Sequence, residues 1–206
     1  GVGDSAKRVE GFLERLGIEG IPNSSIKEVR DGEIELEGGR VLPFAYSMIV
    51  PPFTGVDAVR TSEGLANPMG FVPIDDRFRH PDQTDVYAAG VATAIAPPES
   101  TEVPAGVPKT GQMSEAMAKV AAANIAADLN GGAHRDLPIA ELSAICVLDA
   151  GDNGIIFKAD NVLAHGIYAD GDEPTAKVMA GPQAHWAKLA FERYFLASRK
   201  RGVTAF

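Results

Sequence analysis

The chain has 206 residues, of which 45% are hydrophobic and 23% charged, and its net charge is −9 at pH 7. This length can bury a core in one or two domains, and the acidic balance argues against a broad nucleic-acid surface, which needs clustered Lys and Arg. The single cysteine excludes an internal disulfide, and no apolar run is long enough to cross a bilayer.

The first 44 residues predict a helix followed by a small sheet. Residues 1–6 read GVGDSA, a GxGxxA string, but without a strand pattern before it we interpret it as a turn and helix cap. Apolar residues at helical spacing then predict a helix that ends at Gly17. Alternating apolar and charged residues on both sides of Asp31-Gly32 predict a hairpin, with a third strand at residues 41–44.

Three short apolar runs in the middle of the chain predict buried strands, at residues 47–50, 71–74 and 86–89. Asp75 and Asp76 follow the second run; paired carboxylates can transfer protons, but a solvated strand end is the preferred interpretation. The third run ends at the tight turn of Gly90, and a proline-rich segment follows it.

A helix is predicted from Thr110, as its N-cap, to about Leu129, with Asn130, Gly131 and Gly132 ending it. The order of strand, shaped loop and helix N-terminus suits a polar ligand, because free N–H groups and the positive end of the helix dipole attract negative charge.

The last 60 residues predict a hairpin, one further strand and a helix. Strands at residues 144–148 and 155–159 are joined through Asn153-Gly154, and residues 162–180 are irregular and acidic, with room for one more strand. The final helix, residues 182–199, has aromatic residues on one side and charged residues on the other, so it could lie at a membrane interface or pack as an ordinary amphipathic helix.

Five sequence segments resemble the C-terminal half of sulfide:quinone oxidoreductases, flavoproteins of the two-dinucleotide-domain disulfide-oxidoreductase superfamily. They are AAGVA, the proline-rich loop, GVPKTG, LPFAYSMIVPPFTGVDAV and HWAKLAFERYF. The resemblance runs over nearly the whole chain. It implies an α/β fold: part of a two-dinucleotide-domain flavoprotein with incomplete Rossmann-like domains and a C-terminal region facing quinone and membrane. It also implies that the chain is a fragment, with the FAD-binding GxGxxG segment and the upstream cysteines before Gly1.

The same resemblance divides the chain into three parts. Residues 1–80 are expected to be the remainder of the second dinucleotide-binding-like domain and the return to the FAD domain. Residues 81–130 are expected to complete the C-terminal part of the FAD-binding domain, and residues 131–206 to form the redox-cysteine and quinone-facing region.

Cys146 is the candidate catalytic residue. A lone cysteine in an apolar strand is usually a small buried core residue. The segment AICVLDAGDNG, however, resembles the one that carries the family's C-terminal redox cysteine, which pairs with an upstream cysteine across the flavin. A thiolate is the form that attacks sulfur. We expect Val147 and Leu148 to limit the access of water to it.

The resemblance assigns five residues to FAD. Lys109, Thr110 and Gly111 would face the isoalloxazine, and Gly90 and Val91 would offer backbone groups to the ribityl or pyrophosphate. Val91 stands where the wider superfamily has an Asp that binds the ribityl chain, a difference that agrees with the sulfide:quinone branch. The alternative for Lys109 is a surface lysine before a cap.

The quinone candidates are Ile145, which neighbours the redox cysteine, and Phe191, which by the resemblance matches the family's quinone-stacking phenylalanine in LAFERYF. A flat apolar ring needs two hydrophobic faces, and core packing is the alternative for both residues. The implied partners are sulfide, quinone and a membrane surface contacted by the last helix, without nucleic acid and with a possible homo-oligomer. The parent enzyme would be a peripheral, monotopic membrane protein, and the fragment soluble and without FAD. Alternative readings are the flavoprotein subunit of a flavocytochrome c sulfide dehydrogenase, a type II NADH:quinone oxidoreductase, or a folded but inactive module.

Overall fold

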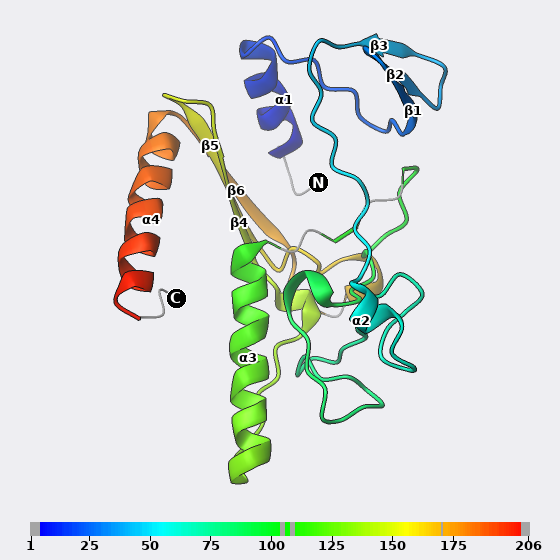
Figure 1. Cartoon of the computed structure of the whole chain (residues 1–206). Helices are drawn as coiled ribbons and strands as arrows, with labels where there is room; N and C mark the ends of the chain where they lie inside the picture. The colour runs from blue at the N-terminus through cyan, green and yellow to red at the C-terminus, as the bar shows by residue number, and fades with distance from the viewer. Residues whose placement is uncertain (1–4, 104–105, 108–109, 170, 203–206) are drawn as a thin grey trace.

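The computed structural model describes residues 5–103, 106–107, 110–169 and 171–202 (Figure 1). The main elements in chain order are α1 (Ser5–Arg15), β1 (Ile26–Arg30), β2 (Glu33–Leu36), β3 (Val41–Pro43), α2 (Asp57–Arg60), α3 (Gly111–Asn130), β4 (Ala144–Asp149), β5 (Gly154–Asp160), β6 (Thr175–Ala180) and α4 (Pro182–Lys200). Three short 3₁₀ turns lie at Gly90–Ala92, Ile139–Glu141 and Gly166–Tyr168.

The N-terminal sheet has the antiparallel order β1-β2-β3. Its first turn is the predicted Asp31-Gly32, where Gly32 has φ = 75°, a value that glycine adopts without steric cost. Arg30 pairs with Glu33 across this turn in the register. The predicted hairpin, the third strand and the end of α1 before Gly17 are therefore confirmed.

The predicted strand at residues 47–50 is wrong. These residues belong to an extended connection between β3 and α2, and Met48 and Val50 are 82% and 70% exposed (Figure 1). An apolar run forms a strand only where another strand pairs with it, and no described residue pairs with this one. The runs at residues 71–74 and 86–89 are likewise reduced to single bridges, Val72 with Thr93 and Tyr87 with Arg79.

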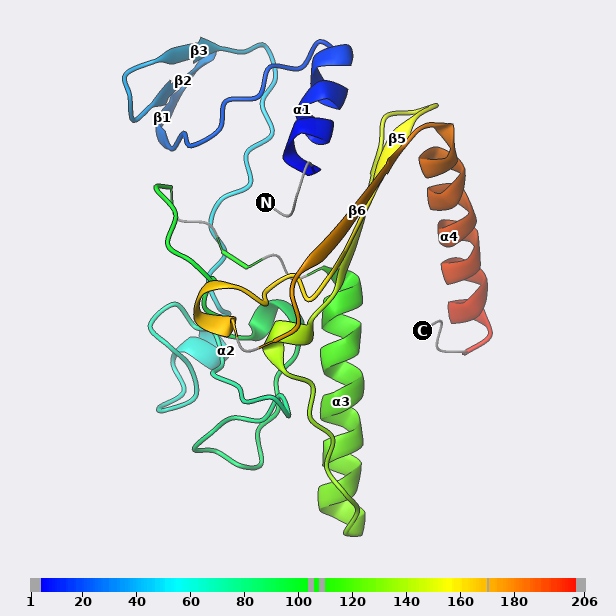
Figure 2. The ribbon, with the colours of Figure 1, turned by 180° about the vertical axis from the view of Figure 1, so that it is seen from behind.

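The main core surrounds the N-terminal half of α3. Phe78, Met113, Met117 and Leu142 are at most 1% exposed and pack in one cluster with Ala144 at the start of β4. The helix ends where predicted, at Gly131, which has φ = 74° and donates its N–H to Ala127 O. Seen from behind, α3 stands below the second sheet and extends away from it (Figure 2).

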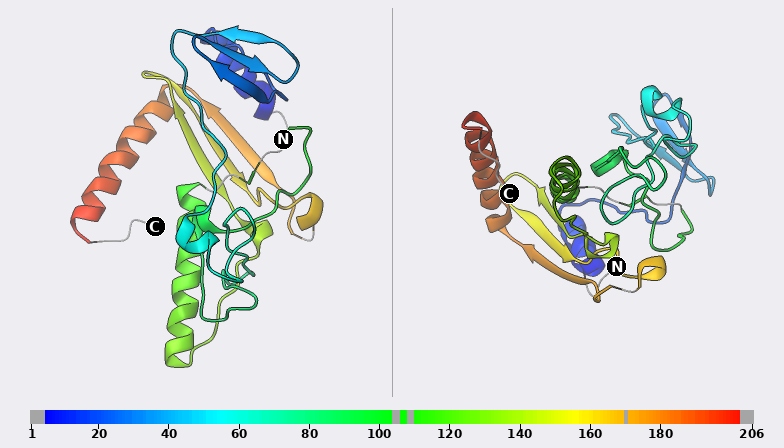
Figure 3. Two further views of the ribbon diagram at one scale, coloured as in Figure 1. Left: turned by 45° about the vertical axis from the view of Figure 1, so that its right-hand side comes forward. Right: turned by 90° about the horizontal axis from the view of Figure 1, so that it is seen from below.

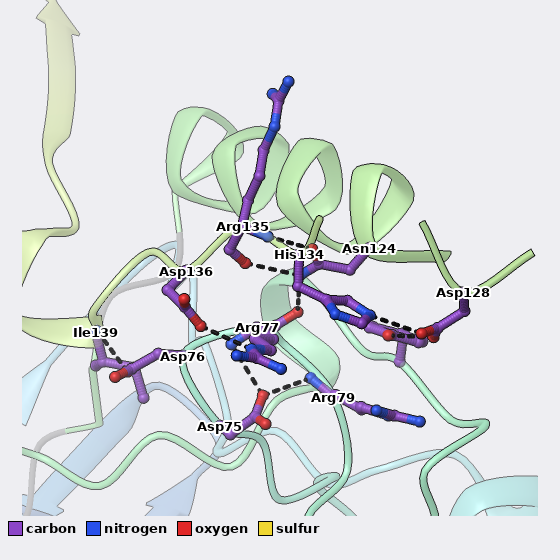
Figure 4. A network of polar contacts seen from close by, with 11 residues as sticks. Asp75, Asp76, Arg77, Arg79, Asn124, Asp128, His134, Arg135, Asp136 and Ile139 are labelled. Carbon is purple, nitrogen blue, oxygen red and sulfur yellow. Dashed lines mark hydrogen bonds and ion pairs between the residues drawn. The ribbon is translucent and has the colours of Figure 1, made fainter. Parts of the chain in front are cut away.

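A network of hydrogen bonds and ion pairs links the C-terminal half of α3 to the loops that contain Arg77 and Arg135 (Figure 4). Asn124 is fully buried; its Nδ2 donates to the carbonyls of Arg77 (3.2 Å) and Arg135 (2.8 Å), and its Oδ1 accepts from the N–H of Arg135 (2.7 Å). Asp75 accepts the N–H groups of Arg77 and Arg79. Asp75 therefore shapes a turn, which agrees with the solvated strand end preferred from the sequence.

The C-terminal sheet is an antiparallel ribbon with the order β4-β5-β6. All three strands and α4 occur where the sequence predicts them. The ribbon rises from the upper end of α3, with α4 beside one of its faces and α1 on the other side (Figure 3). These contacts place the candidate site residues.

Candidate functional site

The register of the C-terminal sheet assigns the side chains of β4 to two opposite faces. Cys146 is paired with Phe157, which is paired with Val178, and directly opposite residues of neighbouring strands point to the same side. Ile145 is paired with Lys158 and therefore points to the other side. The redox candidate and one quinone candidate thus lie on opposite faces of one strand. We name these the Cys146 face and the Ile145 face.

Cys146 is an exposed, free cysteine. The core-residue interpretation is therefore wrong for this structure. The expectation that Val147 and Leu148 limit the access of water is also wrong, because their side chains are 39% and 42% exposed. Cys146 is therefore accessible within the described chain, as a reacting residue must be.

The N-terminus of α3 lies on the same side of β4 as Cys146. Ala144, two residues before Cys146, points to the same face and is buried in the core cluster with Met113 and Met117. Thr110 is the predicted N-cap: its Oγ1 accepts the N–H of Met113 at 3.3 Å. Gly111 is exposed, with open space where a Cβ would point. Lys109 lies outside the described residues.

Gly90 is held against α3 rather than left open for a ligand. Its φ is 69°, and a Cβ at this position would lie 2.7 Å from Oγ of Ser114. Its N–H points to Sδ of Met117 at 3.1 Å, and its carbonyl accepts from Oγ1 of Thr93 at 2.7 Å. The glycine is thus needed for close packing of the turn on the helix. Val91, which is 49% exposed, is the member of the predicted pair that reaches the surface.

Asp149, at the end of β4, anchors α4. Its carboxylate lies 3.0 Å from Nδ1 of His185 and 3.2 Å from Nζ of Lys188, and it accepts the N–H of Gly151 at 3.0 Å. These hydrogen bonds, that from His185 first, hold the pKa of Asp149 below its ordinary value. Asp149 points to the Ile145 face, since the two are four residues apart on one strand. The helix α4 therefore covers that face.

The sequence interpretation of α4 is wrong at this contact, because it placed His185 and Lys188 on the side away from the apolar residues. The sheet-facing side also contains Ala184, which is fully buried and lies 3.1 Å from the Cβ position of Gly154. Phe191, seven residues after Ala184, returns to the same stripe of the helix. Its ring stacks on Phe195 with centroids 6.1 Å apart and is half exposed.

The two quinone candidates lie on the same side of the sheet. From the contact of Asp149 with His185, the lower end of the ribbon is reached by going back along β4 and forward along α4 (Figure 1). Ile145 is about 13 Å along the strand from this contact, and Phe191 about 9 Å along the helix. Both residues therefore lie on the side of the ribbon that α4 covers.

Sequence reasoning assigned no separate role to Asp149. The sequence does contain a signal for this contact: Asp149 follows an apolar strand, and His185 and Lys188 are three positions apart in the last helix. Over the part of the chain that the structure describes, no group of three or more His, Cys, Asp or Glu could hold a metal. Within the same residues, no helix combines the length and apolar character needed to span a membrane.

The fold is of the mixed α/β class. It matches the X-ray structure of the sulfide:quinone oxidoreductase from the hyperthermophilic bacterium Aquifex aeolicus with a TM-score of 0.86 and 33% identity, over 100% of this chain and 47% of that chain. In sequence, the chain is 34% identical over 213 aligned positions to the sulfide-quinone reductase of Aquifex aeolicus (strain VF5). No protein-family model matches the chain.

The chain is therefore homologous to about half of a sulfide-quinone reductase: the alignment covers all of it and 47% of the relative. This confirms the resemblance read from the sequence and the α/β class, although the two sheets within the described residues are antiparallel.

Proposed function

We propose that these residues form part of a flavoprotein that oxidises sulfide to polysulfide or sulfur and reduces a membrane quinone through FAD. The observation that carries the proposal is the division of β4. Cys146 shares a face with the N-terminus of α3, whereas Ile145 shares the other face with α4. Such a strand would keep the reaction of sulfide on the Cys146 face and the reduction of quinone on the Ile145 face. The same proposal includes the three parts of the chain. Residues 1–80 are the remainder of the second dinucleotide-binding-like domain and the return to the FAD domain, residues 81–130 are the C-terminal part of the FAD-binding domain, and residues 131–206 are the redox-cysteine and quinone-facing region.

The residues at the N-terminus of α3 fit one edge of an isoalloxazine ring. Gly111 is exposed and has open space beside it, and the first turn of a helix offers N–H groups and positive charge to electron-rich carbonyls. Thr110 orders this turn as its cap, and Lys109 would add an ammonium group. The backbone at Val91 would contact the ribityl chain, with Gly90 holding that turn on the helix. FAD, when bound, would accept two electrons from sulfide and deliver them to quinone.

The face covered by α4 fits a quinone and a lipid surface. Ile145 and Phe191 would provide the two apolar walls for the ring. Elsewhere on the helix, Trp186, Tyr194 and Leu196 are 67%, 52% and 52% exposed, and Arg199 and Lys200 end it with positive charge. Exposed aromatic residues followed by basic residues are typical of a helix in a membrane interface. This supports peripheral membrane association.

The decisive test is sulfide-dependent quinone reduction by the complete enzyme that carries these residues. Reduction of a soluble quinone with sulfide as donor, without need of NADH or a cytochrome, would support the proposal. Reduction of quinone by NADH without sulfide would instead identify a type II NADH:quinone oxidoreductase. Transfer of sulfide electrons to a cytochrome alone would identify a flavocytochrome c subunit.

A further inference from the structure

A groove lined by cations lies between α1 and β6. It has a volume of about 230 Å³, and its lining residues are Lys7, Arg8, Gly11, Arg15, Val178 and Ala180. Three of the four residues from α1 are positively charged, and none of the six is negatively charged. In a chain of net charge −9, this is a local concentration of the opposite sign.

No carboxylate among the described residues forms an ion pair with the positive charges of this groove. Across the described residues, Lys7, Arg8 and Arg15 take part in no ion pair. Arg8 instead donates to the carbonyl of Val178 at 3.4 Å, and the Arg15 guanidinium lies 5.7 Å from the ring centroid of Phe12. The acidic residues of α1, Glu10 and Glu14, do not line the groove, although they lie one and two turns from Lys7 along the helix. A recess lined by one sign of charge attracts small ions of the other sign.

The groove opens on the Cys146 face of the C-terminal sheet. Val178 is paired with Phe157 and Phe157 with Cys146, so the three side chains form one row on that face. Two strand spacings separate Val178 from Cys146, a distance of about 10 Å. The strand residues on this face are all uncharged: Ala144, Cys146, Leu148, Ile155, Phe157, Ala159, Ala176, Val178 and Ala180.

We propose that Lys7, Arg8 and Arg15 form a binding site for small sulfur anions, hydrosulfide or polysulfide, and hold them beside Cys146. The terminal charge of such an anion suits the three cations, and the apolar sulfur chain suits the row of Val178 and Phe157 that leads to the cysteine. The identity of the anion rests on the proposed function. The attraction of anions to the groove rests only on its charges and its position.

The single cysteine allows this site to be tested in the 206-residue chain itself. The Cys146 thiolate attacks an aromatic disulfide, forms a mixed disulfide and releases one aromatic thiolate, whose absorbance gives the rate. Two probes are compared: dithiobis(nitrobenzoate), which is anionic, and dithiodipyridine, which is neutral. Their ratio reports local charge, because access and folding affect both probes.

The test variant carries Lys7→Gln, Arg8→Gln and Arg15→Gln. The ratio of its rates with the anionic and the neutral probe is expected to fall roughly five- to tenfold at low salt if the three charges act over about 10 Å in water, because any effect on the reactivity of Cys146 itself changes both rates equally. The effect should vanish at about 1 M salt. The matched control is the triple variant Lys119→Gln, Arg193→Gln, Lys200→Gln, which loses the same net charge elsewhere. The proposed site would be wrong if both triple variants lost the same rate with the anionic probe, or if the groove variant changed its rates with the two probes equally.

The complete enzyme then distinguishes the two sulfur anions. If hydrosulfide is the ligand, the groove variant lowers kcat/KM for sulfide in a salt-dependent manner and leaves kcat unchanged. If polysulfide is the ligand, the variant changes kcat through product release. If Cys146 still reacts faster with the anionic probe but the enzyme oxidises no sulfide, the sulfur assignment and the proposed function are both wrong. In that case the groove is still an anion-binding site.

Discussion

Nδ1 of His185 lies 3.0 Å from Oδ1 of Asp149, and this contact determines which face of the C-terminal sheet α4 covers. The helix is otherwise weakly buried: among its described residues only Ala184 and Ser198 are fully packed. A polar contact at the end of β4 therefore directs the aromatic stripe of α4 toward Ile145. The arrangement of the candidate quinone site depends on this link.

The first prediction concerns the pH dependence of this anchor. Asp149 has a pKa held below its ordinary value of 3.8, first by the hydrogen bond from His185. A carboxylate whose pKa is lower in the folded than in the unfolded state stabilises the fold at any pH above its unfolded-state pKa. This stabilisation is lost as the pH falls through the folded-state pKa. Asp149→Asn should therefore lower the urea midpoint at about pH 7, and the deficit relative to wild type should shrink toward about pH 3. A deficit that is constant with pH would contradict the anchor's ionic character.

The second prediction concerns Cys146. In the complete enzyme, Cys146→Ser should abolish sulfide oxidation while FAD remains bound, because a hydroxyl cannot form a persulfide or a disulfide bridge. Because Cys146 is exposed, this small change should leave the fold intact. Flavin absorbance and circular dichroism check binding and folding. Sulfide turnover near the wild-type rate would remove the redox role.

The third prediction concerns Phe191. In the complete enzyme, Phe191→Ala should slow flavin reoxidation by quinone and raise the quinone KM, while flavin reduction by sulfide stays normal. Since the side chain is half exposed, the stability cost should be about 1 kcal/mol, below that of a buried phenylalanine.

Stopped-flow measurement separates the two half-reactions of this variant. The matched control is Trp186→Ala, another exposed aromatic of α4 on a different side of the helix. If both half-reactions slow equally, or if Trp186→Ala has the same effect, the quinone binds elsewhere.

The fourth prediction concerns Gly90. Gly90→Ala should destabilise the chain by about 1–3 kcal/mol, because the residue has φ = 69° and its new Cβ would meet Ser114. Gly111→Ala is the control, since that position has an ordinary φ and open space. Urea unfolding of both variants measures the difference. Equal stability of the two would show that the turn relaxes freely away from α3.

The fifth prediction concerns the cofactor. The 206-residue chain by itself should not retain FAD, because the contacts proposed here are mostly backbone groups at one end of the cofactor. The chain also aligns with only 47% of the relative. The purified protein should be colourless after desalting. A yellow sample with flavin absorbance equal to the protein concentration would contradict this expectation.

The sequence by itself determined the local elements whose signals are local. Asp31-Gly32 fixes a hairpin turn, Thr110 caps α3, Gly131 ends it, and the apolar run around Cys146 forms a strand. Each of these follows from the backbone preferences of a few neighbouring residues, so no distant contact is needed to predict them. The sequence segments also carried the resemblance to sulfide:quinone oxidoreductases, which the homology confirms.

Only the tertiary structure decided which residues share a face and which apolar runs find a strand partner. Residues 47–50 have a strand composition, but no described strand lies beside them to complete a ladder. The sides of α4 were misassigned because helical periodicity does not say which side meets the sheet, and the Asp149 contact makes that choice. The separation of Cys146 from Ile145 follows from the β4-β5-β6 register, which also shows that the groove of the α1 cations lies on the Cys146 face. Strand register is a long-range property, set by packing between segments far apart in the chain.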